Sequence, residues 1–273
     1  MRREQIAINS VSTRQRDLVE ALDAYAAAGF RSVEFVLPLI KGWLAAGHTV
    51  ADVRGLLEER GLRSIGGFEA PVVCFGEGTA QAANHALQRA NAQLIHDLGG
   101  GTLVVGTDGP PQPNVAALDE AAQTLAQLAR QIEGLDVTIA VEFNWSPLVR
   151  SLSSAVRVAQ AANHPQVGVL FDPAHYYVTP TKREDLTPEA VRWVRHVHLN
   201  DMRDKPPDLS HCNDDRVLPG SGVLDLAGLI ALLEAGGYSG YFAIEMFNAD
   251  LWALPAATAA ERCYASMLAA CAD

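Results

Sequence analysis

His-Val-His-Leu-Asn-Asp at residues 196–201 follows directly on Arg195 and has the form of a buried β-strand that ends in polar residues. Three other stretches have the same form: Val-Glu-Phe-Asn (141–144), Phe-Asp-Pro-Ala-His (171–175) and Ile-Glu-Met (244–246). Together the four stretches supply three carboxylates and one imidazole, at Glu142, Asp172, His198 and Glu245. Four metal-ligand side chains at the carboxyl ends of successive strands indicate a metal site in a parallel barrel.

Strand-like and helix-like runs alternate along the whole chain around these motifs. The expected strands are Ile6–Asn9, Val33–Leu37, Leu62–Phe68, Leu103–Val105, Val137–Glu142, Val167–Phe171, Arg195–Leu199 and Tyr241–Glu245. The expected helices are Arg14–Ala28, Thr49–Arg60, Thr79–Leu98, Val115–Ile132, Pro147–Ala162, Pro188–Val194, Asp225–Ala235 and Ala256–Ala270. This pattern predicts an α/β protein that forms a single (β/α)8 TIM barrel over residues 1–273.

An open, doubly wound sheet is the competing fold. It needs a glycine-rich phosphate turn after the first strand, and Asn9-Ser10-Val11-Ser12 is not such a turn.

Composition narrows the class of protein. The formal net charge of −11 disfavours nucleic-acid binding, because proteins that grip phosphate backbones are normally basic. No apolar stretch is long enough for a membrane helix, and the four-residue apolar run that follows Met1–Gln5 is too short for the hydrophobic region of a secretory signal, so a cytoplasmic protein is expected. The four cysteines show no CxxC spacing and are expected to be reduced and structural.

The four motif residues are expected to hold one divalent cation. Ionised carboxylates at the top of a buried strand are costly unless a cation or hydrogen bonds compensate them, and close carboxylates repel one another. Because the ligand set is rich in oxygen, Mn²⁺ is the expected metal, with Mg²⁺, Co²⁺ and Zn²⁺ as alternatives. The alternative to a metal site is that the four side chains are separate caps or ion pairs.

Two polar residues near the motifs are candidates for contact with substrate. His175, three residues after Asp172, is expected in an extended or loop segment that reaches the mouth of the barrel, where the carboxyl ends of the strands meet. Otherwise it packs beside Tyr176 and Tyr177. Arg216 precedes a Pro-Gly turn that could aim it into the mouth, where it would neutralise an anion. The alternative for Arg216 is a loop salt bridge with Asp214 or Asp215.

Further candidates are less distinctive. Asn144 and Glu69 are also expected to bind the substrate. Trp145 and Trp43 are candidate pocket residues, and the alternative for Trp145 is a packing role at the barrel rim. Glu69 begins the mostly apolar 69–78 loop, a candidate pocket wall or lid. The 200–221 loop is long enough to suggest a function. His196 projects to the same side of its strand as His198 and is expected to pack or support within the barrel interior.

At these motifs the chain resembles the xylose isomerase-like TIM-barrel superfamily over essentially its whole length. The order Glu…Asp-x-x-His…His-x-His-x-x-Asp…Arg…Gly-x-Gly…Glu is similar to that of the ketose 3-epimerases and the inosose dehydratases. The resemblance implies metal ligands at Glu142, Asp172, His198 and Glu245. It also implies that His175 and Arg216 contact the substrate.

By this resemblance the protein is expected to be a metal-dependent isomerase or epimerase of a sugar or keto-sugar. Glu142 and Glu245 would remove and return a proton through a metal-bound cis-enediolate. The partner is expected to be a small sugar or polyol without a phosphate, and the sequence allows a homo-oligomer. A metal-dependent lyase of the inosose, 3-dehydroshikimate or keto-glycoside type is the main alternative. An AP endonuclease-like enzyme and a non-catalytic sugar-binding subunit are more remote ones.

Two positions depart from the pattern of the ketose 3-epimerases. Leu148 stands where those enzymes have a further glutamate, and Gly220-Ser221-Gly222 replaces their Gly-Glu-Gly. Because barrels of one family host many reactions, these departures leave the exact reaction open.

Overall fold

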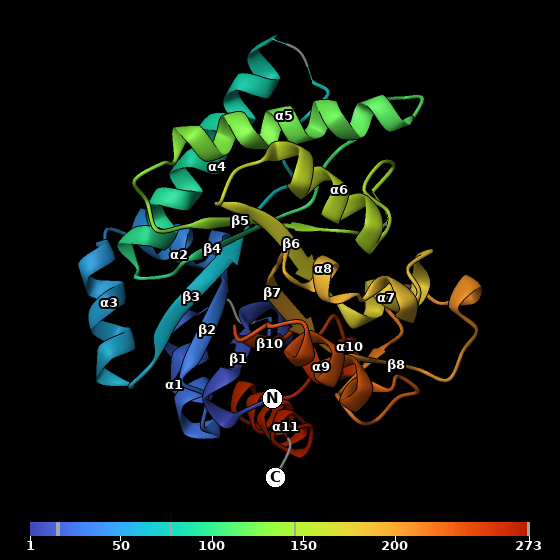
Figure 1. Ribbon diagram of the computed structural model, residues 1–273. Coiled ribbons are helices and arrows are strands. Elements are labelled where there is room, and N and C mark those ends of the chain that lie inside the picture. The colour runs from blue at the N-terminus through green and yellow to red at the C-terminus, as the bar shows by residue number, and fades with distance from the viewer. Residues whose placement is uncertain (15–16, 77, 145, 272–273) are drawn as a thin grey trace.

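The computed structural model describes residues 1–14, 17–76, 78–144 and 146–271. Eight parallel strands close into a barrel in the order β1-β10-β7-β6-β5-β4-β3-β2 (Figure 1). The barrel strands are β1 (Ile6–Asn9), β2 (Ser32–Val36), β3 (Arg63–Phe68), β4 (Thr102–Val105), β5 (Thr138–Glu142), β6 (Val167–Phe171), β7 (Val194–Leu199) and β10 (Phe242–Ile244). The predicted single (β/α)8 barrel is therefore confirmed, and the open doubly wound sheet is excluded.

Helices surround the barrel on its outside (Figure 1). The helices are α1 (Leu18–Ala28), α2 (Leu37–Ala45), α3 (Val50–Glu59), α4 (Gly78–Asp97), α5 (Val115–Gln131), α6 (Leu152–Ala162), α7 (Pro173–Val178), α8 (Pro188–Val191), α9 (Leu226–Ala235), α10 (Ala249–Trp252) and α11 (Ala256–Ala269). Among these helices, the most extensive packing is that of α1 against α11 and of α5 against α6. Within the described ranges, no helix is both long and apolar enough to cross a bilayer.

Short polar side chains set where several helices begin. Thr49, the predicted N-cap of α3, accepts a hydrogen bond from the backbone N–H of Asp52, and Asn114 caps α5 in the same way. Asp17 and Ser151 cap α1 and α6. The predicted starts at Arg14 and Pro147 were therefore four and five residues too early, because in both cases the capping side chain lies further along the chain.

Three of the described α-helices were not predicted: α2, α7 and the short α10. Residues 37–45 form α2, with Pro38 in its first turn, where proline is tolerated because the N–H it lacks would have no partner. The second is α7, which has Pro173 at its first position and Asp172 as its N-cap. His175 therefore lies in the first turn of a helix, and its expected placement in an extended or loop segment was wrong.

The 200–221 segment is ordered by its own hydrogen bonds. Strands β8 (Asp201–Met202) and β9 (Arg216–Val217) pair antiparallel and bring Arg216 opposite Met202. The Asp201 carboxylate accepts hydrogen bonds from the backbone N–H groups of Gly220, Gly222 and Leu224. One buried carboxylate thus fixes the Pro-Gly-Ser-Gly turn against the strand end.

The four cysteines are all free thiols, as expected. Cys74, Cys212 and Cys263 are buried, and burial raises the pKa of the Cys74 thiol to about 12, with the Asp108 carboxylate adding to the rise.

A glycine in β3 permits the close approach of the neighbouring strand. A Cβ atom at Gly66 would lie 2.2 Å from the backbone oxygen of Thr102 in β4. We expect Gly66→Ala to lower the free energy of unfolding by about 1–3 kcal/mol, the usual cost of overpacking.

Gly55→Ala is the matched control, because a Cβ atom at Gly55 in the middle of α3 has nothing within 4 Å. That variant should gain up to about 1 kcal/mol from helix propensity. Urea unfolding followed by circular dichroism measures both values. Equal stability of the two variants would contradict the close approach.

Candidate metal centre

A cavity of about 510 Å³ lies at the carboxyl ends of the barrel strands. Its walls combine aromatic, hydroxyl, amide and charged side chains. The lining residues are Phe68, Pro71, Val104, Gly106, Thr107, Glu142, Asn144, Ser146, His175, His198, His211, Cys212, Asn213, Arg216, Glu245 and Phe247. The 200–221 segment contributes four of them, so its predicted functional role is consistent with its position, whereas the 69–78 loop contributes Pro71.

The four predicted ligands converge on one point beside this cavity. Glu142 closes β5, Asp172 follows β6, His198 lies in β7 and Glu245 follows β10. Each offers one ligand atom, and these atoms all lie within 4.8 Å of one another. Ligands about 2.0–2.2 Å from one ion stand roughly 3–4 Å apart, so small side-chain movements would complete a coordination sphere.

Both carboxylate oxygens of Asp172 make contacts that fix its position. Its Oδ1 accepts hydrogen bonds from the N–H of Ala174 at 2.7 Å, as helix N-cap, and from the Asn200 amide at 3.1 Å. Its Oδ2 lies 3.1 Å from Nη2 of Arg216. The Asp-Pro dipeptide therefore starts α7 and at the same time orients a carboxylate oxygen toward the site.

Arg216 is the only fully buried guanidinium among the described residues. Its Nη1 donates to the Glu245 carboxylate at 2.6 Å, and its Nε donates to the backbone oxygen of Cys212 at 2.7 Å. The alternative salt bridge with Asp214 or Asp215 is not formed; Lys205 pairs with Asp215 instead. Arg216 thus lines the predicted mouth, but its charge is already engaged by Asp172 and Glu245.

The charged groups of the site shift one another's pKa values. Burial alone would raise the pKa of Glu142, but the His175 and His198 rings outweigh it and lower that pKa to about 2. Burial would likewise lower the pKa of His175, yet the Glu142 and Asp172 carboxylates raise it to about 10. His175 Nε2 lies 3.3 Å from Glu142 Oε1. The site therefore stabilises ionised carboxylates beside a protonated His175.

Two buried ligand atoms, Oε1 of Glu142 and Nδ1 of His198, have no hydrogen-bond partner among the residues that the structure describes. His198 Nδ1 stands 3.1 Å from Glu245 Oε2, 3.6 Å from Glu142 Oε1 and 3.7 Å from Asp172 Oδ2. An imidazole nitrogen surrounded by three carboxylate oxygens has the donor set of a divalent cation site. The residues present therefore fit a divalent cation.

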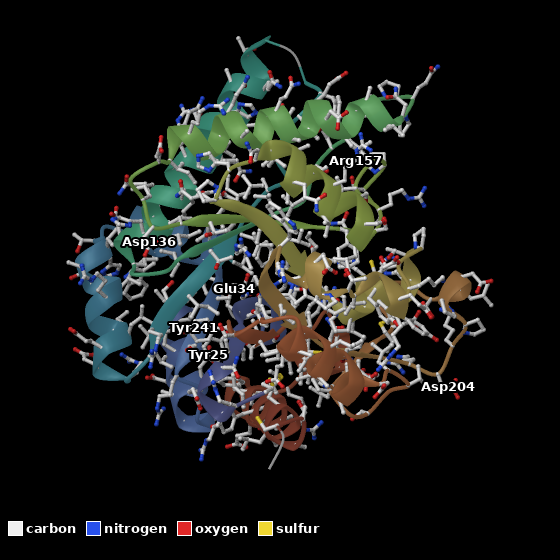
Figure 2. The ribbon with its side chains drawn as sticks, viewed as in Figure 1. Tyr25, Glu34, Asp136, Arg157, Asp204 and Tyr241 are labelled. Carbon is white, nitrogen blue, oxygen red and sulfur yellow. The ribbon has the colours of Figure 1, made fainter. Side chains whose placement is uncertain are left out.

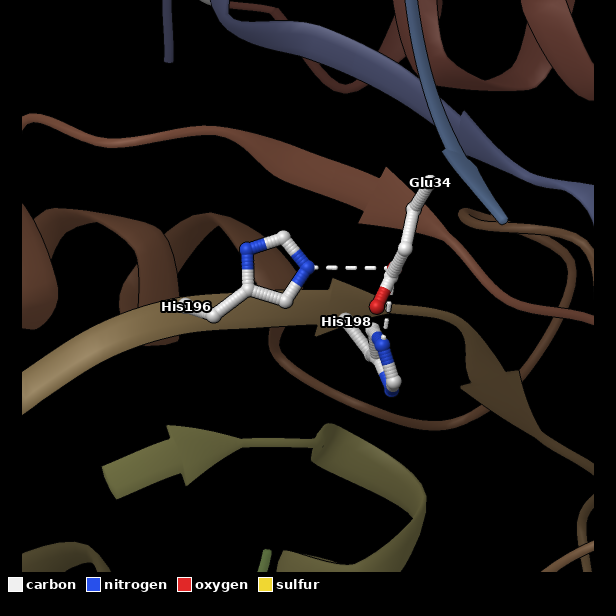
Figure 3. Close-up of side chains that lie close together, drawn as sticks. All are labelled: Glu34, His196 and His198. Atoms are coloured by element: carbon white, nitrogen blue, oxygen red, sulfur yellow. Dashed lines mark hydrogen bonds and ion pairs between the residues drawn. The ribbon is translucent and has the colours of Figure 1, made fainter. Parts of the chain in front are cut away.

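Glu34 in β2 was not predicted as a site residue, and it is fully buried inside the barrel (Figure 2). Its Oε2 lies 3.1 Å from Nε2 of both His196 and His198 (Figure 3). The expected supporting position of His196 in the barrel interior is therefore confirmed. The available signal was one glutamate within the apolar run Val33-Glu34-Phe35-Val36, since an unpaired charge is rarely buried.

The other candidate residues differ in where they lie relative to the cavity. Asn144 lines the cavity as expected. Glu69 does not line it in the described part of the chain and forms an ion pair with Lys41. Trp43 stacks on His48 and lines a different cavity of about 590 Å³. Trp145 lies outside the described residues.

The two departures from the epimerase pattern also lie outside the described lining of the cavity. Leu148 is a buried core residue. Ser221 lines a separate cavity near Arg262 on α11, while its flanking glycines serve the Asp201 turn.

Comparison with known proteins gives concordant results. A family model described as "Xylose isomerase-like TIM barrel" matches residues 22–266. An inosose isomerase of Bacillus licheniformis is 30% identical over 138 residues, 50% of this chain and 49% of that protein. A 3-dehydroshikimate dehydratase of Pseudomonas aeruginosa is 28% identical over 252 residues, 87% of this chain and 37% of that protein. The chain spans about half the length, or less, of these curated relatives.

Among solved structures, the fold is similar to that of an IOLI protein with a bound zinc atom. The TM-score is 0.86 at 20% sequence identity, over 97% of each chain.

The position of Arg216 predicts an unusually large stability effect. In metal-free protein, Arg216→Met leaves Asp172 and Glu245 buried without their cation, so we expect a loss of about 3–5 kcal/mol in the free energy of unfolding. Urea unfolding in EDTA measures this, and added Mn²⁺ should restore part of the loss by supplying positive charge.

Arg157→Met is the matched control, because Arg157 pairs with Asp119 at 3.1 Å on the surface. Its loss should stay below about 1 kcal/mol. Comparable losses in the two variants would show that Arg216 does not compensate the buried carboxylates.

Proposed function

The chain belongs to the xylose isomerase-like TIM barrel family, and we propose that it is a divalent-metal-dependent isomerase or epimerase. Its proposed substrate is a polyhydroxy ketone or aldose, and the reaction moves a proton at the carbon beside the carbonyl. The observation that carries the proposal is the convergence of Glu142, Asp172, His198 and Glu245 within 4.8 Å beside a cavity of about 510 Å³.

We propose Mn²⁺ as the ion, held by these four residues. When bound, a divalent ion would polarise the substrate carbonyl and acidify the neighbouring C–H. The oxygen-rich donor set supports Mn²⁺ over a structural zinc site, which prefers thiolates.

Glu142 and Glu245 are the proposed proton-transfer groups. Their carboxylates come from β5 and from the end of β10, and both line the cavity. Glu142 is the more open, with 16% of its side chain exposed against 5% for Glu245, which is held by Arg216. Glu142 is therefore better placed to remove the substrate proton, and Glu245 to return one on the other face.

The lining supports an uncharged polyol as substrate. Asn144, Thr107 and Ser146 offer amide and hydroxyl groups of the kind that bind sugar hydroxyls, and Phe68 and Phe247 offer apolar surface. The Arg216 guanidinium is engaged by two carboxylates. Because no other Arg or Lys is among the described lining residues, we propose that the substrate carries no phosphate.

A dehydratase is the second candidate function, and two observations favour it. The match to a 3-dehydroshikimate dehydratase extends over 87% of this chain. His175 carries a proton beside Glu142, so it could donate that proton to a departing hydroxyl group. In that case the C–O bond breaks after proton removal, and water leaves instead of the proton returning to carbon.

A panel of keto-inositols and unphosphorylated keto-sugars in D₂O tests the proposal. Isomerisation or epimerisation incorporates deuterium at the carbon beside the carbonyl, whereas dehydration releases water and forms a conjugated enone that absorbs in the ultraviolet. Mass spectrometry and absorbance separate the two. Absence of both reactions with metal-loaded protein would favour a non-catalytic sugar-binding role.

Glu142→Gln and Glu245→Gln should each lower kcat by at least about 10²–10⁴-fold, because a neutral amide cannot accept the proton. Exposed Glu133→Gln, on the outside of the barrel, is the control and should keep wild-type turnover. Circular dichroism checks the fold of all three. Wild-type kcat in either site variant would reject its assigned role.

Removal of the ion should abolish activity and lower the melting temperature. An ion present at about 100 times its Kd stabilises the native state by about 2.7 kcal/mol. Activity and thermal unfolding are measured after EDTA treatment and again after Mn²⁺ is added back, with elemental analysis confirming the metal content. Full activity in protein shown to be metal-free would contradict metal dependence.

A further inference from the structure

Glu34, His196 and His198 form a cluster at the inner side of the proposed metal site, which we call the Glu34 cluster. Glu34 comes from β2, and both histidines come from β7 on the other side of the barrel interior (Figure 3). All three side chains are at most 2% exposed. The proposed reaction gives Glu34 no role, although a buried carboxylate is costly to keep.

Hydrogen bonding fixes the state of both rings. Glu34 Oε2 accepts three hydrogen bonds, each at 3.1 Å. The donors are Nε2 of His196, Nε2 of His198 and the side-chain amide of Asn9. A carboxylate oxygen can only accept, so each Nε2 carries the proton. His198 is thereby left with Nδ1 as the nitrogen that faces Glu142, Asp172 and Glu245.

Asn9 connects the Glu34 cluster to a second proposed ligand. Its amide nitrogen donates to Glu34 Oε2 at 3.1 Å and also lies 3.3 Å from Glu245 Oε1. The side-chain oxygen Oδ1 of Asn9 accepts a hydrogen bond from the backbone N–H of Val11, which fixes the orientation of the Asn9 amide. The Asn9 amide thus links the Glu34 and Glu245 carboxylates by hydrogen bonds.

We propose that Glu34 is a positioning residue that selects the His198 tautomer with Nδ1 free and aims that nitrogen at the metal ion. The proposal rests on the proposed metal site and adds the residue that prepares its one nitrogen ligand. A carboxylate behind a metal-bound imidazole fixes the ring and strengthens it as a ligand, and its loss typically weakens metal binding about 10–100-fold. His196 holds the same Glu34 oxygen from the side.

A second cation within the Glu34 cluster is the competing explanation, because its three residues also offer ligand atoms within 4.8 Å of one another. The separations of 3.1 Å from Oε2 to each Nε2 are those of hydrogen bonds. The Asn9 amide donates to the same oxygen. These contacts favour the positioning role, and the metal stoichiometry of the whole protein decides between the two.

Co²⁺ titration of wild-type protein, Glu34→Gln and His196→Gln tests the proposal. Wild-type protein should bind one equivalent. Glu34→Gln should bind Co²⁺ about 10–100-fold more weakly and with an altered visible absorption spectrum, because the nitrogen ligand is less well oriented. His196→Gln is the matched comparison: His196 is equally buried, and because glutamine keeps a donor toward Glu34, this variant should weaken Co²⁺ binding less than Glu34→Gln does.

Thermal unfolding of the metal-free variants separates positioning from simple packing. If both variants lose stability and metal affinity to the same extent, Glu34 is only a packing residue and the proposal fails. Two equivalents of Co²⁺ in wild-type protein would also overturn it. If wild-type protein binds no Co²⁺, the proposed metal function fails as well; if it binds one equivalent and Glu34→Gln binds equally well, only this inference fails.

Histidine-selective NMR of Zn²⁺-loaded wild-type protein provides a test that needs no variant. We expect His198 to bind Zn²⁺ through Nδ1 and to keep its proton on Nε2. A ring bound through Nε2 would overturn the proposal even if Glu34→Gln does not fold.

Discussion

The site depends on the compensation of buried negative charge. Glu34, Glu142, Asp172 and Glu245 gather within one end of the barrel. Burial alone would raise the pKa of Glu34, Glu142 and Asp172 and so disfavour their ionised forms. Arg216 neutralises part of this charge through Asp172 and Glu245. Arg216 and the His175 beside Glu142 supply fewer positive charges than the four carboxylates carry, and a divalent cation is the simplest species that would supply the rest. Much of the architecture around the mouth serves to hold these groups at fixed distances.

The segments after the strands can be understood from this requirement. The Asp172 side chain begins α7 and presents its other oxygen to Arg216. The β8–β9 hairpin carries Arg216 back over the mouth, and Asp201 closes the turn that follows it. A displacement of either element would separate Arg216 from its carboxylates and leave charge buried without compensation. Local backbone structure and site electrostatics are therefore coupled, so the hairpin is a structural part of the site as well as a loop beside it.

The fold and the four proposed ligands could be predicted because both depend on local patterns. An apolar run ending in Glu, Asp or His reports a strand and its mouth residue within a few positions, and the closed barrel then brings those ends together. Glu34 could not be found in this way, because it is separated by 162 residues from His196 and 164 from His198 and acquires its role only when the barrel closes. The position of His175 was missed for a different reason: Asp172 was interpreted only as a ligand, although Asp-Pro is also a helix start. A residue with two roles is easily assigned only one.

The departures from the epimerase pattern carry less weight in the structure than in the sequence. Leu148 belongs to the core, and Ser221 faces a different cavity. In the proposed reaction, the choice between returning a proton and expelling a hydroxyl group would depend instead on which acid lies beside Glu142. His175 Nε2 lies 3.3 Å from Glu142 Oε1, the pKa of His175 is raised to about 10, and Arg216 Nη2 lies 3.5 Å from its Nε2. Because a cation beside an imidazolium favours release of its proton, Arg216 opposes the two carboxylates that hold the proton on His175. We propose that the balance among these neighbours, all of them outside the four ligand motifs or at their edge, decides whether the proposed proton abstraction ends in isomerisation or in dehydration.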